Sequence, residues 1–163
     1  EFACHFSAAN VHVMAGNSSG EEAHQSFITS LVYACQQAKS LNKTILIEPL
    51  NKYVAPGYFL QTTRQAANII EQVGEPNLKL MFDCYHVQLN EGDVGNKLRS
   101  LLPIIGHIQF ASVPDRQEPL EGELSYPYLF ELIDELGWNK PLGAEYCPKT
   151  TVENGLNWLQ RYL

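Results

Sequence analysis

The stretch TILIEP, residues 44–49, is a short apolar run that ends on an acidic side chain, Glu48. Three later runs share this form, ending on Asp83 (LKLMFD, 78–83), Gln109 (GHIQ, 106–109) and Glu145 (LGAE, 142–145). The successive positions 48, 83, 109 and 145 are 35, 26 and 36 residues apart, each close to one strand plus one returning helix. Residues at the carboxyl ends of the strands of a parallel barrel meet at one mouth, where the active sites of that architecture lie. The spacing therefore predicts a ring of oxygen-bearing side chains, and hence an enzyme.

The rest of the chain continues this alternation of strand and helix. Apolar runs of about five to seven residues alternate with amphipathic stretches of roughly ten to twenty, which is typical of repeated βα units. Strands are predicted at 10–16, 44–49, 78–83, 104–111 and 141–146, each with a helix after it. Thr62 or Thr63 is expected to begin one helix that ends at Gly74, and Thr150 to begin the last. The sequence thus predicts an α/β fold, a (β/α)8 TIM barrel represented by five of its eight units.

The whole chain, 1–163, is predicted to form a single domain. A closed barrel takes about 250 residues, whereas this chain has 163. We therefore expect the carboxyl-terminal portion of a barrel, with residues 1–9 as an atypical lead-in that does not fit a βα unit. A partial barrel leaves strand edges unpaired, which favours aggregation.

Composition and charge narrow the class of protein. Hydrophobic residues make up 45% of the chain and charged residues 18%, as in ordinary soluble globular proteins. The net charge of -7 argues against a nucleic-acid partner, which requires a basic surface. No run approaches the roughly 18 apolar residues of a membrane span, so no membrane partner is expected. The four cysteines form no CxxC pair and are expected to be reduced, which fits a cytoplasmic location, although the chain begins at Glu1 without an initiator methionine.

The four strand-end residues form a ligand set suited to a hard cation. Three carboxylates and one amide oxygen favour Mg²⁺ or Mn²⁺ over zinc, which prefers histidine and cysteine. We therefore predict a divalent-cation site and no organic cofactor, with these ligands: Glu48, Asp83, Gln109 and Glu145. Each carboxylate alone could instead be a helix cap or a solvated loop residue, and Gln109 could be a hydrogen-bonding strut.

Two of these carboxylates are also candidates for proton transfer. Glu48 and Glu145 come from the second and fifth units, so they could approach a bound molecule from opposite sides. Such a pair suits proton abstraction from one carbon of a small carbonyl compound and return to its neighbour, through an enediolate. Partial burial would raise their pKa values toward the operating pH.

Three further residues are candidates for substrate binding. His86 follows Asp83 by three, and its neutral imidazole could hydrogen-bond a substrate oxygen or orient Asp83; a histidine satisfied by the backbone is the alternative. His107 precedes Gln109 by two and should share its face of the strand. Arg116, in the loop after Gln109, is suited to gripping a substrate carboxylate with two hydrogen bonds. His12 is predicted only to pack inside the barrel.

Four segments carry a resemblance to a known family: IEPLN at 47–51, DCYHVQ at 83–88, GHIQFASVPDRQEPLEGELSY at 106–126 and GAEYCP at 143–148. They resemble the hydroxypyruvate isomerases of the xylose-isomerase-like TIM barrels. The resemblance implies interconversion of hydroxypyruvate and 2-hydroxy-3-oxopropanoate (tartronate semialdehyde). It matches Glu48 and Glu145 to the proton donor and acceptor, and the four strand-end residues to the metal ligands. The first three βα units of that family have no counterpart in this chain.

Two other functions are compatible with the same residues. A ketose 3-epimerase of the same superfamily would share three of the four strand-end residues but usually has histidine in place of Gln109. A carboxylate-gripping Arg116 favours a small keto or hydroxy acid over a neutral sugar. The alternative from another class is a catalytically inert truncated product. The sequence gives no indication of oligomeric state.

Overall fold

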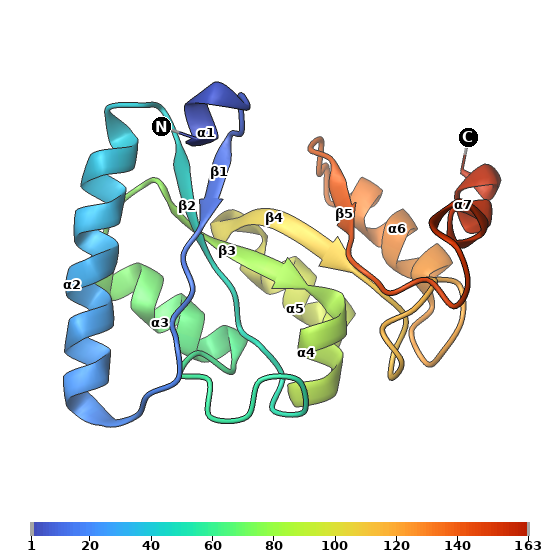
Figure 1. Ribbon diagram of the computed structural model, residues 1–163, viewed down its shortest axis with the longest axis horizontal. Helices are drawn as coiled ribbons and strands as arrows, with labels where there is room; N and C mark the ends of the chain where they lie inside the picture. The colour runs from blue at the N-terminus through green and yellow to red at the C-terminus, as the bar shows by residue number, and fades with distance from the viewer. Residues whose placement is uncertain (1, 163) are drawn as a thin grey trace.

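The computed structural model describes residues 2–162. Its five parallel strands form one sheet in which each strand lies beside the next in chain order (Figure 1). The strands are β1 (Asn10–His12), β2 (Thr44–Ile47), β3 (Leu78–Asp83), β4 (Ile105–Phe110) and β5 (Leu142–Ala144). Every neighbouring pair is parallel, and β3 and β4 shift register at Leu80 and Met81. This is the strand order of five consecutive units of a TIM barrel, as predicted.

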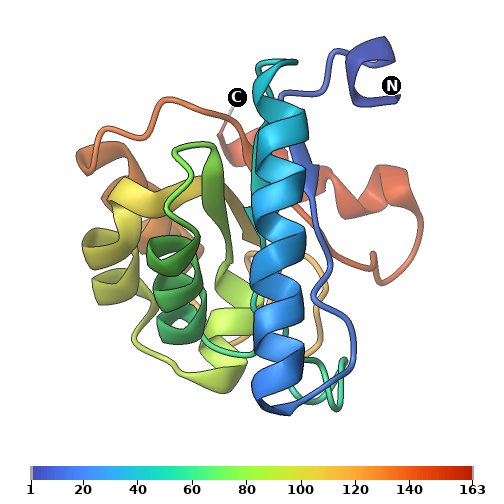
Figure 2. The same cartoon turned by 90° about the vertical axis from the view of Figure 1, so that its left-hand side faces the viewer.

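Helices follow the strands and cover one side of the curved sheet (Figure 1), with the long α2 running along it in the turned view of Figure 2. The α-helices are α1 (Phe2–His5), α2 (Gly20–Lys39), α3 (Thr63–Val73), α4 (Cys84–Asn90), α5 (Val94–Leu101), α6 (Tyr126–Glu135) and α7 (Val152–Gly155). Two 3₁₀ turns complete the set, η1 (Leu102–Ile104) and η2 (Asn157–Arg161).

The ends of two helices are set by side-chain caps and by a glycine. Thr62 caps α3 by accepting a hydrogen bond from the Gln65 backbone N–H, and Gly74 ends that helix in the left-handed conformation, as predicted. The last helix is capped by Thr151 rather than Thr150, because it is the Thr151 side chain that accepts from the Asn154 N–H. The short helix α4 was not predicted.

The two faces of the sheet have different roles because side chains alternate along each strand. Ile45 and Ile47 of β2, and Leu80 and Phe82 of β3, belong to the core between sheet and helices. Helix α2 contributes one apolar stripe to this core, made of Phe27, Leu31, Cys35 and Ala38. The intervening residues face the inner side of the sheet. Asp83 of β3 and Gln109 of β4 lie on this inner face near the carboxyl ends of their strands, and Glu48 and Glu145 directly follow β2 and β5.

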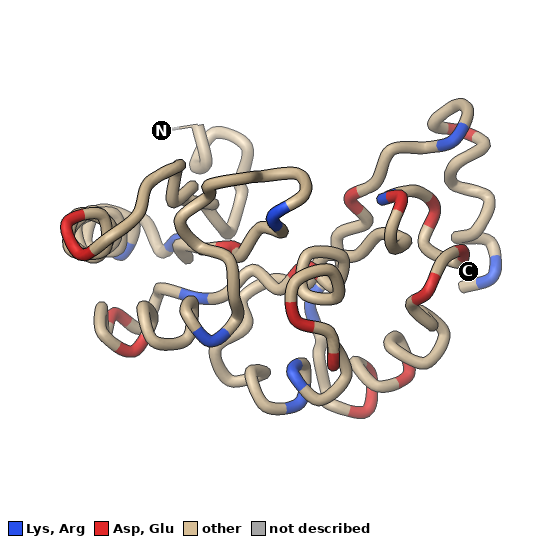
Figure 3. The backbone as a smooth tube through the Cα atoms, turned by 90° about the horizontal axis from the view of Figure 1, so that it is seen from below, with Lys and Arg blue, Asp and Glu red and all other residues tan. Residues whose placement is uncertain are grey.

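Acidic and basic residues are mixed along the rest of the chain. Figure 3 shows acidic positions on helices and loops along the whole chain, with basic positions interspersed among them. Within residues 2–162, none of the helices combines the length and the apolar character needed to cross a membrane.

Candidate active site

A pocket of about 380 Å³ lies at the carboxyl ends of the strands, on the inner face of the sheet. Its lining includes five of the residues singled out from the sequence: Glu48, His86, Gln109, Arg116 and Glu145. Asp83 lies directly behind this lining, 1% exposed and within 3.6 Å of both His86 Nε2 and Arg116 Nη2. A volume of this size is at the small end of ligand pockets and suits a compact substrate.

Glu48 is a buried carboxyl group without a full set of hydrogen bonds. It follows β2, is 5% exposed, and its Oε1 has no hydrogen-bond partner among the described residues. Burial, together with the negative charges of Asp83 and Glu145, raises the pKa of Glu48 to about 8, against a weaker opposing effect of Arg116. In the metal-free chain this shift favours the protonated form of Glu48 at neutral pH, which is the form that a proton donor requires.

Asp83 has two roles that use different oxygens. It is the N-cap of α4, where its Oδ1 accepts a hydrogen bond of 2.9 Å from the Tyr85 backbone N–H. Its Oδ2 is buried and has no hydrogen-bond partner in the part of the chain that is described. Burial raises the pKa of Asp83 to about 7, although the Tyr85 N–H and Arg116 act in the other direction.

Arg116 supplies the positive charge of the pocket. Its Nη2 donates to Glu145 Oε2 at 2.9 Å, and its guanidinium lies over the Tyr85 ring, 5.0 Å from the centroid. The backbone of Arg116 is left-handed, with φ 53°, and is held by hydrogen bonds to Ser112 and Cys147 on its two sides. A strained non-glycine residue fixed by its surroundings is common at functional sites. The loop thus holds this side chain between two carboxylates.

The loop that carries Arg116 depends on Gly122. A Cβ at this position would lie 2.2 Å from the Val113 carbonyl oxygen, and its φ of +90° already disfavours other residues. We expect Gly122→Ala to lower the free energy of unfolding by about 3 kcal/mol or more, because a backbone clash adds to the conformational strain. Thermal unfolding followed by circular dichroism measures this loss.

Gly57→Ala is the matched control for that variant. Gly57 has a similar φ of +80°, but nothing lies within 4 Å of its Cβ position. The free energy of unfolding of Gly57→Ala should fall by only about 1–2 kcal/mol, from conformational strain alone. Equal losses in the two variants would show that the close approach of Gly122 to Val113 does not matter.

The oxygen atoms of the pocket fit a divalent cation. Three buried acceptors at this site have no donor among the described residues: Glu48 Oε1, Asp83 Oδ2 and Gln109 Oε1. Hard cations such as Mg²⁺ and Mn²⁺ bind such oxygens. Ligand atoms of Glu48, Asp83 and His86 also lie within 4.8 Å of one another. Glu145, the fourth predicted ligand, is 54% exposed and is engaged with Arg116.

His107 and His12 differ from what the sequence suggested for them. His107 shares the inner face with Gln109 but lies beside Gly143, where an added Cβ would come within 2.8 Å of its Nε2; it is not among the residues that line the pocket. His12 does line the pocket, with its Nε2 3.7 Å from Glu48 Oε2. The alternation in NVHVMAG, which sends His12 and Met14 to one face, was the signal that could have found it.

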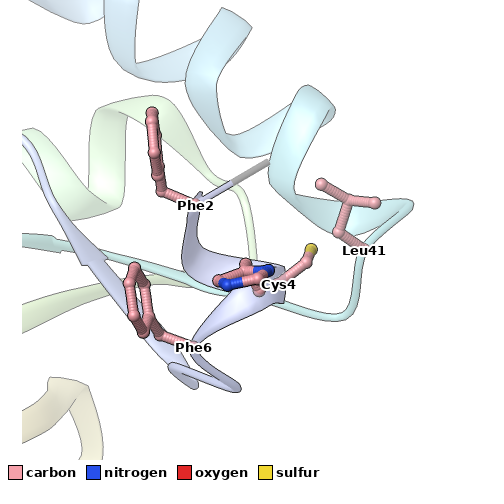
Figure 4. Close-up of a pocket in the computed structure, with 5 residues that line it drawn as sticks. Phe2, Cys4, Phe6 and Leu41 are labelled. Carbon is pink, nitrogen blue, oxygen red and sulfur yellow. The ribbon is translucent and has the colours of Figure 1, made fainter.

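A larger hollow lies elsewhere, at the amino-terminal end of the chain. It measures about 700 Å³ and is lined by Phe2, Cys4, His5, Phe6 and Leu41 (Figure 4). Among residues 2–162 its lining is mostly apolar and holds no carboxylate, so the carboxylate pocket is the better candidate for proton chemistry.

Consecutive parallel βα units with acidic residues gathered at the carboxyl ends of the strands define a protein of the TIM-barrel class. The sequence profile of the xylose isomerase-like TIM barrel family matches residues 1–162, and the chain belongs to this family. The match includes the lead-in 1–9, which the sequence alone set apart.

Individual relatives agree with this family. The chain is 45% identical over 157 residues to the 2-oxo-tetronate isomerase of Cupriavidus necator, covering 94% of this chain and 60% of that protein. It is 41% identical over 144 residues to the hydroxypyruvate isomerase of Escherichia coli, covering 88% of this chain and 56% of that protein. A crystal structure of an AP endonuclease, family 2, from Brucella melitensis superposes with a TM-score of 0.95 at 36% identity, covering 99% of this chain and 64% of the other. The chain therefore spans less than two thirds of the length of each of these proteins.

Proposed function

We propose that the protein is an isomerase of short keto acids that interconverts hydroxypyruvate and 2-hydroxy-3-oxopropanoate by proton transfer between two glutamates. The observation that carries this proposal is the pairing of unlike carboxyl groups in one pocket. Glu48 is buried with a pKa raised to about 8, whereas Glu145 is half exposed and ion-paired with Arg116. Two relatives that bear isomerase names for 2-oxo-tetronate and hydroxypyruvate support the same reaction class.

The different environments assign different starting roles to the two groups. Glu145, which is ion-paired with Arg116, accepts a proton from C3 of hydroxypyruvate, and the C–H electrons form the C2=C3 double bond of an enediolate. The hydroxyl proton on O3 passes to the oxygen on C2. The protonated Glu48 then delivers its proton to C2, which leaves an aldehyde at C3 and a hydroxyl at C2. In the reverse direction the two glutamates exchange roles.

The remaining polar residues bind and stabilise the reacting molecule. A divalent cation, held by Asp83 and Gln109 together with the oxygens of Glu48 and Glu145 that do not carry the transferred proton, would stabilise negative charge on the substrate oxygens. Arg116 is the cation of this chain that lines the pocket, and its Nε is buried without a hydrogen-bond partner in the described residues. An incoming carboxylate can take up that donor, which favours a keto acid over a neutral sugar.

Incubation of the purified chain with hydroxypyruvate and Mg²⁺ or Mn²⁺ tests the proposal, with the aldehyde product measured by proton NMR. Glu145→Gln is expected to lower kcat by about 10²-fold or more, since the amide cannot accept the C3 proton. Because Glu145 is 54% exposed, this variant should keep the fold.

Glu131→Gln, at an exposed position of α6, is the control and should turn over like the unchanged chain. Full activity of Glu145→Gln would exclude the two-glutamate mechanism. Failure of the unchanged chain to form aldehyde, while a version extended to the length of its relatives succeeds, would favour the inert-product alternative. Epimerisation of free ketohexoses in preference to hydroxypyruvate would favour the sugar epimerases.

A further inference from the structure

The imidazole of His86 receives two hydrogen bonds at the same ring nitrogen. The backbone N–H of Asn51 donates to His86 Nδ1 at 3.0 Å, and the Asn51 side-chain Nδ2 lies 2.9 Å from the same atom. Both residues are buried, with 0% and 2% of their surfaces exposed. Because a backbone amide and an amide nitrogen can only donate, His86 Nδ1 must be the acceptor.

The orientation of the Asn51 side chain is fixed by independent contacts. Its Oδ1 accepts hydrogen bonds from the backbone N–H groups of Tyr53, at 3.0 Å, and Val54, at 3.2 Å. Exchanging the oxygen and nitrogen of the amide would place donors against both of these N–H groups. The side-chain nitrogen of Asn51 therefore faces His86, and the hydrogen-bond network allows only this orientation of the Asn51 amide.

An imidazole whose Nδ1 accepts hydrogen bonds keeps its lone pair there and carries its proton on Nε2. His86 Nε2 points to the acidic side of the pocket, 3.6 Å from the unpartnered Oδ2 of Asp83. We propose that Asn51 is a positioning residue that holds His86 in the Nε2–H tautomer, so that His86 is a fixed hydrogen-bond donor to the pocket and not a metal ligand.

This assignment separates His86 from the carboxylates that surround it. By distance alone, His86 could join Glu48 and Asp83 around a cation, because their ligand atoms lie within 4.8 Å of one another. A metal-bound histidine nitrogen needs a free lone pair, however, and neither nitrogen of this tautomer offers one. The cation is left to the oxygen ligands. The Nε2–H group of His86 can then donate a hydrogen bond to Asp83 or to a substrate oxygen. Donation to a substrate oxygen rests on the proposed function.

The tautomer can be observed directly by ¹⁵N NMR of the ring nitrogens in the full chain at pH 7, with the His86 signals assigned through His86→Gln. The expected spectrum has a proton-bearing Nε2 and an unprotonated Nδ1. Scalar coupling across the hydrogen bonds should connect Nδ1 with the two nitrogens of Asn51. A protonated Nδ1, or a ring with protons on both nitrogens, would overturn the proposal without any variant.

Asn51→Asp tests the role of the side chain. The new carboxylate can still accept from the backbone of residues 53 and 54, but it presents an acceptor where Nδ2 presents a donor. We expect Nδ1 of His86 to gain a proton in this variant. An unchanged His86 spectrum in a folded Asn51→Asp chain would show that the Asn51 side chain does not set the tautomer.

Asn90→Asp is the matched control, since Asn90 anchors the same loop without contacting His86. Its Nδ2 donates to the carbonyls of Leu50 and Gln61, at 3.1 and 2.7 Å. This variant should lose thermal stability and keep the His86 spectrum. A change of tautomer in Asn90→Asp would point to general loosening of the loop and contradict the proposal.

The same experiment distinguishes this inference from the proposed reaction. If the chain does not turn over hydroxypyruvate, the tautomer is still measured in the spectrum. If the chain does turn over, Asn51→Asp should lower kcat by about 10–100-fold, as is usual for loss of a residue that orients a site group. Normal turnover with an altered tautomer would retain Asn51 as the positioning residue and remove His86 from the reaction.

Discussion

Glu48→Gln is expected to lower kcat for hydroxypyruvate by about 10³-fold and, at the same time, to stabilise the fold at alkaline pH. The loss of activity follows because glutamine has no proton to deliver to C2. The gain in stability follows because glutamine removes a carboxyl group that ionises in a buried position, 5% exposed and close to two other acids. Opposite effects on activity and stability are typical of a strained active site.

The pH dependence of the second effect can be derived from linkage. In the unfolded chain a glutamate titrates near 4.5, whereas the pKa of Glu48 in the folded chain is about 8. Between these two values the folded state binds more protons than the unfolded state, so the free energy of unfolding falls as the pH rises. Below pH 4.5 both states are protonated and Glu48 contributes no such loss. The pKa of Asp83 is also raised, to about 7, so its ionisation likewise lowers the free energy of unfolding as the pH rises.

Thermal unfolding of metal-free protein in a chelating buffer, at pH 4.5 and pH 8.5, measures this difference. Allowing for the cost of burying an amide, we expect Glu48→Gln to be more stable by on the order of 2 kcal/mol at pH 8.5, or about 4–8 °C in Tm. At pH 4.5 this gain should be absent, and Glu48→Gln should be no more stable than the unchanged chain. Glu71→Gln, at an exposed position of α3, should leave Tm unchanged at both pH values. A difference in stability between the two chains that is the same at pH 4.5 and pH 8.5 would mean that Glu48 is ionised without cost.

The fold could be predicted from the sequence because periodic patterns encode its elements. The four residues Phe27, Leu31, Cys35 and Ala38 recur at helical spacing, and these are the residues that α2 buries. The runs ending at Glu48 and Asp83 bring those carboxylates to one site, with Glu48 in the lining of the pocket and Asp83 directly behind it. The spacing thus placed groups that are 35 residues apart in the chain side by side.

What the sequence could not give depends on contacts between distant segments or on one residue with two roles. Helix α4 begins directly after β3 because Asp83 is both the strand-end acid and the helix cap. Asn51 looks like an ordinary loop residue, and only its contact with His86, 35 positions away, shows its importance. The position of His107 away from the pocket depends on how far along β4 the pocket extends, which alternation does not specify.

Arg116→Met is expected to destabilise the chain at pH 9 by about 2 kcal/mol and to have little effect at pH 6. The guanidinium lies 2.9 Å from Glu145 and 3.6 Å from Asp83, and it lowers the pKa values of Asp83 and Glu48 that burial would otherwise raise further. Below about pH 7 those two acids are protonated in the folded chain, so they gain little from the positive charge. Above pH 8 they ionise, and loss of the arginine leaves buried negative charge without a counter-charge.

The backbone strain at position 116 does not confound this comparison. Arginine and methionine both carry a Cβ, so the left-handed φ of 53° has the same cost in either residue. Arg99→Met, at an exposed position of α5, controls for the loss of a positive charge from the chain and should unfold like the unchanged protein at both pH values. Arg116→Lys should recover most of the stability at pH 9, because it restores the charge. It should not recover KM for hydroxypyruvate, because an ammonium cannot grip a carboxylate with two parallel hydrogen bonds. A loss of stability in Arg116→Met that is equal at pH 6 and pH 9 would mean that the side chain acts by packing on Tyr85 rather than by its charge.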